Sequence, residues 1–343
     1  MKKKKIFIPI IIVLVIIGII GGAGYWMINS KLSKINTTKI SKKPSDLGID
    51  TKQFNTNTDT NKDIAKNYTN ILLMGADSRD PSTDPGLVDS IMILTIDRAH
   101  NKIKITSLMR DMLIDNIQGE GATAGTTQDR INVIYKQGGG KNGGGQYAIK
   151  AINSNFDMDI KDYVKVDFTH FDKIVDTVGG IDMDVSSDEV DIANGYIREV
   201  AKLEGTKAPL LTHGGMQHLS GIQALGYSRI RYVGRQDFQR TERQRAVLTQ
   251  VFSKLASMNP TDASTALDTI FPDVETSLSK TDILSDISYV ITNKIKTLNQ
   301  FRLPEDKPGY NYTKTINGVY FLGWDKAGNV ADLHQFIFEG DLK

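Results

Sequence analysis

Residues 71–110 decide the fold, because three apolar runs follow one another there: ILLMG (71–75), SIMILTID (90–97) and KIKITSLMR (102–110). Short apolar runs of this kind are typical of buried strands. In the third run, Ile103 and Ile105 alternate with Lys104 and Thr106, which is the period of a strand. Only residues 98–101 separate the second run from the third, a hairpin-length connection. The stretch therefore favours an antiparallel meander of three strands.

The rest of the chain mixes helical patterns with further strands. Helical periodicity is seen at about 145–156, 168–178 and 218–226, and most clearly at 240–255. Strands and helices mixed in this order predict a layered α/β domain with a mixed sheet. The glycine-rich residues 138–145 are interpreted as a flexible surface loop, since the spacing of a phosphate-binding loop is missing.

The first 27 residues have the layout of a membrane anchor. MKKKK at 1–5 carries four lysines and no acid, and an apolar run follows at 6–27. At 1.5 Å per residue this run would form roughly 33 Å of helix, enough to cross a bilayer core. Tyr25 and Trp26 fall at its far end, where aromatic side chains suit the lipid–water interface. A cleaved signal peptide has a similar layout, but the run is longer than a usual signal core, which favours an uncleaved transmembrane helix.

Charge and cysteine content indicate the compartment and exclude one class of partner. A short N-terminal side before a large domain favours an N-terminus inside the cell, and the absence of cysteine fits an exported domain. Without the four leading lysines, 38 basic residues stand against 40 acidic ones, a net charge of −2. A general nucleic-acid-binding surface would leave a basic domain. We therefore expect a single-pass protein of the cell membrane, with its domain on the extracellular face and no nucleic-acid partner.

Charged residues gather at one edge of the predicted meander. The end of the first strand, the start of the second and the end of the third share that edge. Carboxylates beside guanidiniums there suit a metal ion together with phosphate, and hard oxygen ligands suit Mg²⁺ or Mn²⁺. Each aspartate alone is as readily a turn residue, so the prediction depends on the combination. The residues concerned are Asp77, Arg79, Asp89, Arg110 and Asp111.

An arginine-rich segment, GYSRIRYVGRQDFQRTERQRAVL at 226–248, supplies the second half of the predicted site. Arg229 and Arg231 are two residues apart and would point to one face of an extended chain. In the helix after Asp237, Arg240 and Gln244 continue the apolar, inward-facing stripe.

Inward-facing arginines need a partner, because burial of an unpaired charge is costly. That partner is either a protein carboxylate, with Asp237 and Asp77 available, or a bound anion. Arginine forks match phosphate oxygens, and a helix N-terminus adds a favourable dipole, so we favour the anion. The remaining arginines of the segment, Arg235, Arg243 and Arg245, are interpreted as a solvated basic face.

Six blocks of the sequence occur in the order seen in the LytR-CpsA-Psr family, which this chain resembles over roughly residues 68–250. The last block is the most diagnostic. The blocks are NILLMGADSR (70–79), LVDSIMIL (87–94), SLMRDM (107–112), RINVIY (130–135), DYVKVDFTHFDKIVDTVGGIDMDV (162–185) and LSGIQALGYSRIRYVGRQDFQRTERQR (219–245).

The resemblance implies a three-layer α/β/α domain with an apolar channel for a polyprenyl chain and an arginine-lined mouth for its pyrophosphate. Matching positions make Asp77 and Asp89 the ligands of Mg²⁺, and Asp237 the acidic member of the arginine cluster. With Arg79 added from the sheet edge, the expected substrate-binding residues are Arg79, Arg110, Arg229, Arg231, Arg240 and Gln244, and the expected catalytic residues are Arg110 and Asp237.

Residues 28–68 are rich in Lys, Ser, Thr, Asn and Asp and have few large apolar groups, which predicts a tether. Composition and the resemblance together divide the chain into five parts. These are a cytoplasmic basic segment (1–5), a transmembrane anchor (6–27), an extracellular stalk (28–68), the catalytic domain (69–255) and a C-terminal part that packs on it (256–343).

The implied activity is a glycopolymer transfer. An anionic polymer of the teichoic acid or capsular type would move from a polyprenyl-pyrophosphate carrier to a peptidoglycan sugar hydroxyl, forming a phosphodiester and releasing polyprenyl phosphate. Two alternatives stay open at this point. The same site would hydrolyse the lipid pyrophosphate if water replaced the sugar, and the domain would be a non-catalytic envelope regulator if it only bound its ligand.

Overall fold

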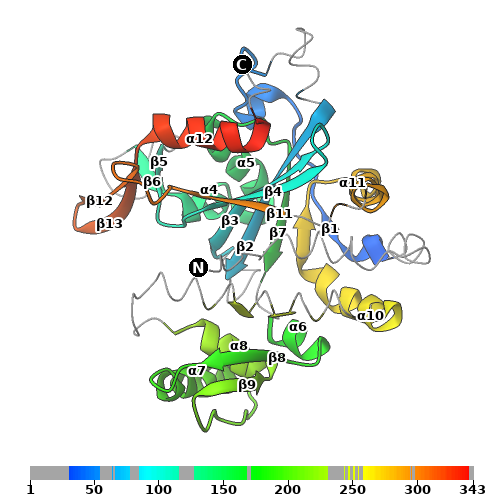
Figure 1. The fold of residues 1–343 in the computed structure, drawn as a ribbon, viewed down its shortest axis with the longest axis vertical. Helices are drawn as coiled ribbons and strands as arrows, with labels where there is room; N and C mark the ends of the chain where they lie inside the picture. Colours follow the sequence, from blue (N-terminus) through cyan, green and yellow to red (C-terminus); the bar gives the residue numbers. More distant parts are fainter. Residues whose placement is uncertain are drawn as a thin grey trace. The chain divides into compact units, whose positions relative to one another are not determined.

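The computed structural model describes residues 31–54, 64, 66–77, 85–115, 127–167, 171–230, 243, 246–247, 250–251, 254, 258–293, 295 and 298–339. The chain divides into two compact units. One comprises the described residues of Met1–Lys34 and His170–Asp273, and the other comprises those of Ile35–Thr169 and Val274–Lys343. The second unit contains the central sheet (Figure 1).

The central sheet has seven strands in the order β1-β10-β7-β2-β3-β4-β11. Its bounds are β1 (Asn36–Thr37), β2 (Tyr68–Asp77), β3 (Leu87–Asp97), β4 (Lys102–Leu108), β7 (Asp162–Asp167), β10 (Val274–Thr276) and β11 (Leu298–Leu303). The pairs β1–β10, β7–β2 and β4–β11 are parallel, whereas β10–β7, β2–β3 and β3–β4 are antiparallel. The prediction of an α/β fold with a mixed sheet is therefore confirmed.

The meander predicted from residues 71–110 is β2-β3-β4. Leu94 is paired with Ile71 on one side and with Ile105 on the other, and a turn at residues 98–101 joins β3 to β4. The β2–β3 register shifts between Gly75 and Ala76, which face Ser90 and Val88, so Asp89 is the additional residue of a β-bulge. Bulges re-aim side chains at sheet edges, and this bulge lies at the edge where the site was expected.

One face of the sheet builds the main core of the larger unit. Leu72 and Met74 of β2 and Ile93 of β3 belong to the same buried cluster as Ile152 and Leu333. The last two come from helices on that side, where apolar residues repeat at helical spacing. The helices of this cluster are α4 (Ile134–Gln137), α5 (Gly144–Phe156) and α12 (Lys326–Phe338).

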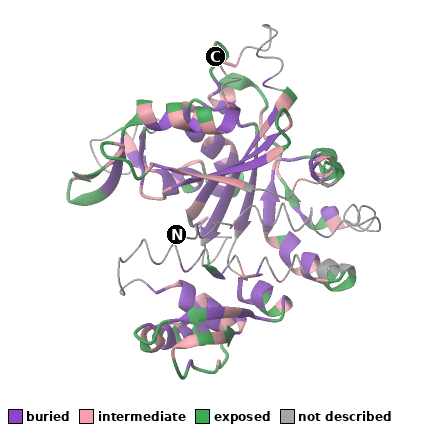
Figure 2. Ribbon diagram, viewed as in Figure 1, coloured by how far each residue is buried: buried purple, intermediate pink, exposed green. Residues whose placement is uncertain are grey.

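The other face of the sheet is buried as well, which explains why the strands read as nearly continuous apolar runs. Figure 2 shows the central strands almost entirely in the colour of buried residues. The residues that alternate with the main core are no more than 3% exposed: Ile71, Leu73, Leu94, Ile103 and Ile105.

The segment interpreted as a stalk is packed on the fold in its described part, and that interpretation is wrong there. Its few large apolar residues are buried, with Leu32 1% and Leu47 0% exposed. Residues of η1 (Leu32–Lys34) contact η5 (Phe271–Asp273), β1 forms the edge strand of the sheet, and η2 (Pro44–Leu47) packs on α5. Low apolar content suggested a tether, but a few well-placed apolar side chains are enough to hold this segment.

The C-terminal part contributes strands to the central sheet and does not only pack on it. Strands β10 and β11 both come from beyond residue 255. Helix α11 (Lys280–Thr292) is attached to the β3–β4 turn, where Arg98 bonds Asp286 at 2.5 Å and Tyr289 bonds Asn101 at 2.8 Å. A two-stranded hairpin follows, formed by β12 (Asn311–Ile316) and β13 (Val319–Trp324).

The glycine-rich stretch is not a flexible loop but a tightly packed turn and helix start. It forms η4 (Gly140–Asn142) and opens α5. A Cβ at Gly144 would collide with the backbone of Tyr135, and one at Gly145 would collide with the Tyr163 ring. The glycines are therefore needed for close approach between α4, α5 and β7.

The smaller unit is a helical layer with one small antiparallel ribbon. Helices α7 and α8 contact each other closely, since Gly226 of α8 lies against the backbone of Ile197 of α7. Its elements are α6 (Phe171–Thr177), β8 (Ile181–Val185), α7 (Val190–Leu203), β9 (Gly215–Leu219), α8 (Gly221–Ser228) and α10 (Pro260–Ile270). Phe171, Ile174, Val175 and Val178 are buried in it.

The predicted transmembrane helix at 6–27 lies outside the described residues. Among the helices that are described, none has the length and apolar character to span a bilayer.

Candidate functional site

The core of the site is an ion pair at the edge of the sheet. Asp89 stands at the bulge near the start of β3, and Arg110 follows the end of β4. Arg110 Nη1 donates to Asp89 Oδ1 at 2.8 Å. The side chains are 18% and 19% exposed, so the pair is neither buried in the core nor freely solvated. The meander thus brings together two of the residues that the sequence predicted.

The pair extends into a chain of alternating charges. Arg110 Nε also lies 3.4 Å from Asp111 Oδ2, and Arg130 Nε lies 3.7 Å from Asp111 Oδ1. Arg130 comes from β6 (Gln128–Arg130), which pairs with β5 (Leu113–Asp115) just after Asp111. Two guanidiniums and two carboxylates balance in formal charge. We refer to Asp89, Arg110, Asp111 and Arg130 as the edge cluster.

Backbone bonds hold the edge cluster in place. The Asn132 N–H, in η3 (Ile131–Val133), donates to the Arg110 carbonyl at 3.3 Å, and the Leu322 N–H of β13 donates to the Asp111 carbonyl at 2.8 Å. Met112 also forms a parallel bridge with Leu322. The Trp324 indole N–H donates to the Leu113 carbonyl at 2.7 Å. The β12–β13 hairpin is therefore fastened to the segment that carries Arg110 and Asp111.

Arg130 ties the same hairpin to the cluster by its side chain. Its Nη2 donates to the Tyr320 carbonyl at 2.6 Å, and its guanidinium lies over the ring of Phe321, 5.4 Å from the ring centre. Phe321 is 1% exposed. Arg130 is the first residue of the RINVIY block, but no spacing rule relates β6 to the end of β4, so the sequence does not predict that it reaches the site. The structure identifies Arg130 as part of the site because it is the second arginine, after Arg110, that contacts Asp111.

The backbone of Asp77 lies beside Asp89 in the sheet. Asp77 is paired with Leu87 across the β2–β3 ladder, two residues from Asp89 along β3. Two carboxylate-bearing residues at one edge are a donor set that suits a hard divalent cation. Asp77 and Asp89 therefore fit the predicted metal ligands by residue type and by register, whereas the Asp89 side chain itself contacts Arg110.

The other predicted site residues lie in the smaller unit or outside the described residues. Arg229 belongs to the smaller unit, where it follows the last residue of α8 and its N–H donates to the Gly226 carbonyl at 3.1 Å. Ser220 is the N-cap of helix α8, and its N–H donates to Gln223 Oε1 at 2.9 Å. The predicted site residues Arg79, Arg231, Asp237, Arg240 and Gln244 lie outside the described residues, as does the Asp77 side chain.

Arg243 corrects one interpretation of the arginine-rich segment. It was assigned to a solvated face, but its side chain is 5% exposed and lies 2.6 Å from Glu189 Oε1. It also donates to the Ile230 carbonyl at 3.1 Å. Glu189, just before α7, provides the compensating charge that makes burial possible. Burial together with this carboxylate raises the pKa of the neighbouring Tyr227 to about 12.

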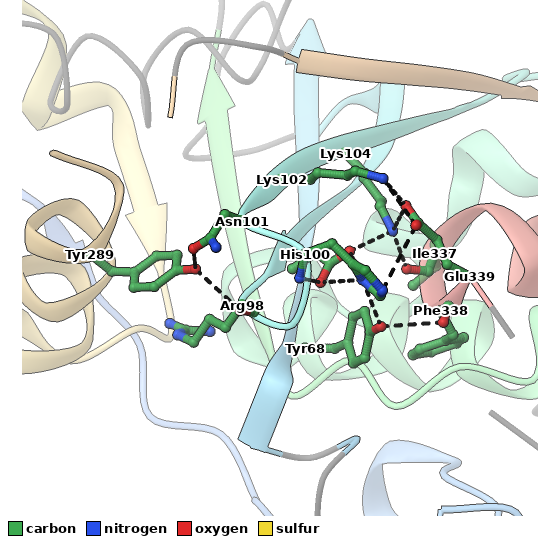
Figure 3. A network of polar contacts seen from close by, with 11 residues as sticks. Tyr68, Arg98, His100, Asn101, Lys102, Lys104, Tyr289, Ile337, Phe338 and Glu339 are labelled. Carbon is green, nitrogen blue, oxygen red and sulfur yellow. Dashed lines mark hydrogen bonds and ion pairs between the residues drawn. The ribbon is translucent and has the colours of Figure 1, made fainter. Parts of the chain in front are cut away.

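A second charged cluster lies at the opposite end of the β3–β4 hairpin (Figure 3). Asp97, His100 and Glu339 bring metal-ligand atoms within 4.8 Å of one another. Lys104 Nζ, however, lies 2.7 Å from Asp97 Oδ2 and 2.9 Å from Glu339 Oε1. The ammonium supplies the positive charge there, so we interpret this group, the lysine cluster of Asp97, His100, Lys102, Lys104 and Glu339, as structural.

Comparison with known proteins agrees with this arrangement. The LytR_cpsA_psr family matches residues 23–333. The polyisoprenyl-teichoic acid–peptidoglycan teichoic acid transferase TagU of Bacillus cereus (strain AH820) is 31% identical over 94% of this chain and 92% of its own length. The transferase TagV of Bacillus subtilis (strain 168) is 30% identical over 57% of this chain and 46% of its own length.

Solved structures share the fold. TagT bound to LIIa-WTA has a TM-score of 0.54 at 22% identity, covering 81% of this chain and 91% of that one. TagV from B. subtilis has a TM-score of 0.54 at 23% identity, covering 80% of this chain and 97% of that one.

Proposed function

Because the chain belongs to the LytR-CpsA-Psr family, we propose that it is a phosphotransferase of the cell envelope. It moves an anionic glycopolymer, of the teichoic acid or capsular type, from a polyprenyl-pyrophosphate carrier to a peptidoglycan hydroxyl. The acceptor oxygen bonds to the polymer-side phosphorus, and the bond from that phosphorus to the bridging oxygen breaks. Polyprenyl phosphate leaves with the bridging oxygen, and the hydroxyl proton is lost. The name of the TagU relative, a teichoic acid–peptidoglycan transferase, supports this choice.

The edge cluster is the observation that carries the proposal. It presents two guanidiniums at a partly exposed edge, and guanidinium forks match phosphate oxygens. Arg110 is shared between Asp89 and Asp111 and therefore has alternative partners when an anion arrives. In that state Arg110 stabilises charge that develops on the transferred and leaving phosphates.

Charge balance supports a metal ion as part of the proposal. The edge cluster is formally neutral, so a pyrophosphate bound there needs further positive charge. Asp77 and Asp89 would hold Mg²⁺, or Mn²⁺, which would supply Lewis-acid neutralisation of the phosphate oxygens. Arg79, Arg229, Arg231, Arg240 and Gln244 would contact the pyrophosphate. Asp237, Asp111 and Asp89 are the candidates for receiving the hydroxyl proton.

The membrane anchor is part of the same proposal. Residues 6–27 would hold the protein in the membrane with residues 1–5 inside the cell and the catalytic domain on the extracellular face. A lipid-linked donor resides in that membrane, so an anchored enzyme meets its donor in two dimensions.

The test is transfer by the full chain in detergent micelles. The assay contains Mg²⁺, a polyprenyl-pyrophosphate oligosaccharide and peptidoglycan fragments, and mass spectrometry follows the products. We expect a phosphodiester-linked adduct that disappears with EDTA and returns with added Mg²⁺. Asp89→Ala and Arg229→Ala should each lower transfer by about 100-fold or more while the protein stays folded.

Arg98→Gln is the matched control. Arg98 lies in the turn at the opposite end of the same β3–β4 hairpin and pairs with Asp286, so its loss should leave transfer within about twofold. Release of phosphate without an adduct would identify a hydrolase instead. Tight lipid binding with no reaction would identify a regulator, and unchanged transfer in folded Asp89→Ala would remove the edge cluster from the mechanism.

A further inference from the structure

We propose that one face of the β12–β13 hairpin, formed by Tyr320, Thr313 and Thr315, is the subsite for the acceptor sugar. This inference rests on the proposed function and adds the place where the glycan strand is held. The ligand class is an uncharged pyranose ring, as found in the backbone of peptidoglycan.

The hairpin exposes aromatic surface beside the edge cluster. Tyr320 is 42% exposed and Tyr312 is 51% exposed, so both are among the exposed large apolar side chains of the described residues. Figure 2 shows most of the hairpin in the colours of exposed and intermediate residues. Tyrosine has a flat apolar ring and a polar tip, which suits the C–H face and the hydroxyls of a sugar.

The register separates the two tyrosines onto opposite faces. Tyr320 is paired with Thr315, and Thr313 is paired with Leu322, so these residues share one face. Tyr312 is paired with Gly323 on the other face, and its ring lies over that glycine, where a Cβ would collide with it. The Tyr312 ring therefore covers a glycine of the partner strand, whereas Tyr320 stands beside two exposed threonine hydroxyls.

Tyr320 is bonded directly to the edge cluster through its backbone. Its carbonyl accepts from Arg130 at 2.6 Å, and the Leu322 N–H two residues later bonds the Asp111 carbonyl. Burial of part of the ring and the nearby Asp111 carboxylate raise the pKa of the Tyr320 phenol, which places the phenol within electrostatic range of Asp111. A ring stacked on Tyr320 would thus extend toward Asp111 and Arg110.

Charge favours a neutral sugar over the other envelope components. Residues 311–324 include a single charged side chain, Lys314, which is on the Tyr312 face and donates to Gln128 Oε1 at 3.2 Å. An anionic polymer would be bound by cations, and a membrane surface would be bound by lysines with large apolar side chains. The face has hydroxyls around an aromatic ring instead.

The experiment measures glycan binding directly, without donor. Full-length protein in detergent is titrated with a tetrasaccharide of N-acetylglucosamine, whose rings are uncharged, and binding is followed by calorimetry and by saturation-transfer NMR. We expect Tyr320→Ala to weaken binding by roughly tenfold, in line with the loss of one aromatic contact. Tyr320→Phe keeps the ring and should retain most of the affinity. Thr315→Val, which keeps the strand shape, should weaken binding by a smaller factor of about three.

Tyr312→Ala is the matched control, since it removes an exposed tyrosine from the same hairpin but from the other face. The proposal is overturned if the wild type does not bind the tetrasaccharide, or if Tyr320→Ala and Tyr312→Ala bind it equally. It is also overturned if Tyr320→Ala loses binding to anionic phospholipid vesicles and keeps binding to the glycan.

Transfer kinetics separate this inference from the proposed function. In an active enzyme, Tyr320→Ala should raise the KM for the acceptor by roughly tenfold and leave the KM for the lipid donor unchanged. An unchanged acceptor KM would overturn the subsite while the transferase stands. Loss of glycan binding in Tyr320→Ala, in a protein whose wild type never forms the adduct, would leave the subsite standing and remove the transferase.

Discussion

The two ends of the β3–β4 hairpin carry charges of the same kinds but in different settings. At one end, Asp89 and Arg110 are 19% and 18% exposed. At the other end, Asp97 and Lys104 are 0% and 1% exposed. Both pairs join a carboxylate of β3 to a cation on or just after β4. The two pairs therefore differ in burial.

At the lysine cluster the buried ammonium of Lys104 has several partners. Lys104 contacts Asp97 and Glu339 and also donates to the Ile337 carbonyl at 2.7 Å, at the C-terminal end of α12 (Figure 3). Tyr68 donates to the Phe338 carbonyl beside it at 3.2 Å. A cation near the last carbonyls of a helix also interacts favourably with the helix dipole. This end fastens α12 to the sheet.

At the edge cluster the described contacts include longer ones. Arg110 lies 2.8 Å from Asp89 and 3.4 Å from Asp111, and Arg130 lies 3.7 Å from Asp111. Partial exposure lets a ligand reach these groups and exchange partners with them. The comparison indicates that charges on the same strand pair serve stability where they are buried and ligand binding where they are partly exposed, and the substitutions below test that contrast.

Lys104→Met should have the largest effect, and the effect should be on stability. It leaves Asp97 buried without its cation, which costs about 3–5 kcal/mol of unfolding free energy. Transfer per folded molecule should stay within about twofold, because the edge cluster is untouched. Urea unfolding and the transfer assay on the same preparation measure both quantities.

A second substitution checks the reason for this loss. Asp97→Asn removes the buried carboxylate that Lys104→Met leaves without its cation, so the double variant Lys104→Met/Asp97→Asn should recover part of the stability. A single Lys104→Met variant as stable as the wild type would mean that the lysine cluster is solvated and does not hold α12.

Arg110→Gln should have the opposite profile. Loss of one stabilising cation should reduce kcat/KM by about 100- to 1,000-fold, equivalent to roughly 2.7–4 kcal/mol of activation free energy. Stability should change by less than about 1 kcal/mol, as for other partly exposed ion pairs. Thermal unfolding beside transfer kinetics tests it, and a large drop in melting temperature would make Arg110 a structural residue instead.

Asp111→Asn should give a smaller, graded loss. The amide keeps the shape but no longer pairs with Arg110 and Arg130, so Arg110 is positioned less firmly. We expect kcat to fall by about tenfold, near 1.4 kcal/mol, with the KM for the donor little changed. A fall as deep as that of Arg110→Gln would instead indicate that Asp111 takes part in proton transfer.

Strand order at the site could be predicted from the sequence, because the relevant signals are local. Apolar runs and a short turn define the β2-β3-β4 meander, and the meander brings Asp89 to Arg110. The bulge at Asp89 could not be predicted, since it depends on the register of two strands. Arg130 and Tyr320 could not be found either, because they reach the site through pairings between distant segments.

Burial of charge was the main source of wrong interpretations. Arg243 is in a run of arginines that reads as solvated, yet Glu189, more than 50 residues earlier, makes its burial possible. Lys104 alternates with Ile103 and Ile105, as a residue on the polar side of a strand would, yet it is 1% exposed because Asp97 and Glu339 surround it. Sequence periodicity assigns a charged residue to solvent, and only the tertiary structure shows its partner.

Substitution of Glu339 should have the smallest effect, and it tests the lysine cluster through the pH dependence of stability. Burial alone would raise its pKa, but hydrogen bonds from Lys102 and Lys104 outweigh burial and hold the pKa at about 2, below the ordinary 4.5. Because its folded pKa is lowered, the carboxylate contributes stability above pH 4.5 and loses that contribution as the pH falls toward 2.

Its side chain is 28% exposed, so solvent screening limits the contribution to about 1 kcal/mol. The unfolding free energies of wild type and Glu339→Gln should therefore differ at pH 7 and converge near pH 2. Glu204→Gln, at an exposed glutamate of the smaller unit, serves as the control and should follow the wild type at every pH. A wild-type–variant difference that stays constant from pH 7 to pH 2 would mean that Glu339 holds α12 by shape and not by charge, and the two ends of the hairpin would then differ in chemistry as well as in burial.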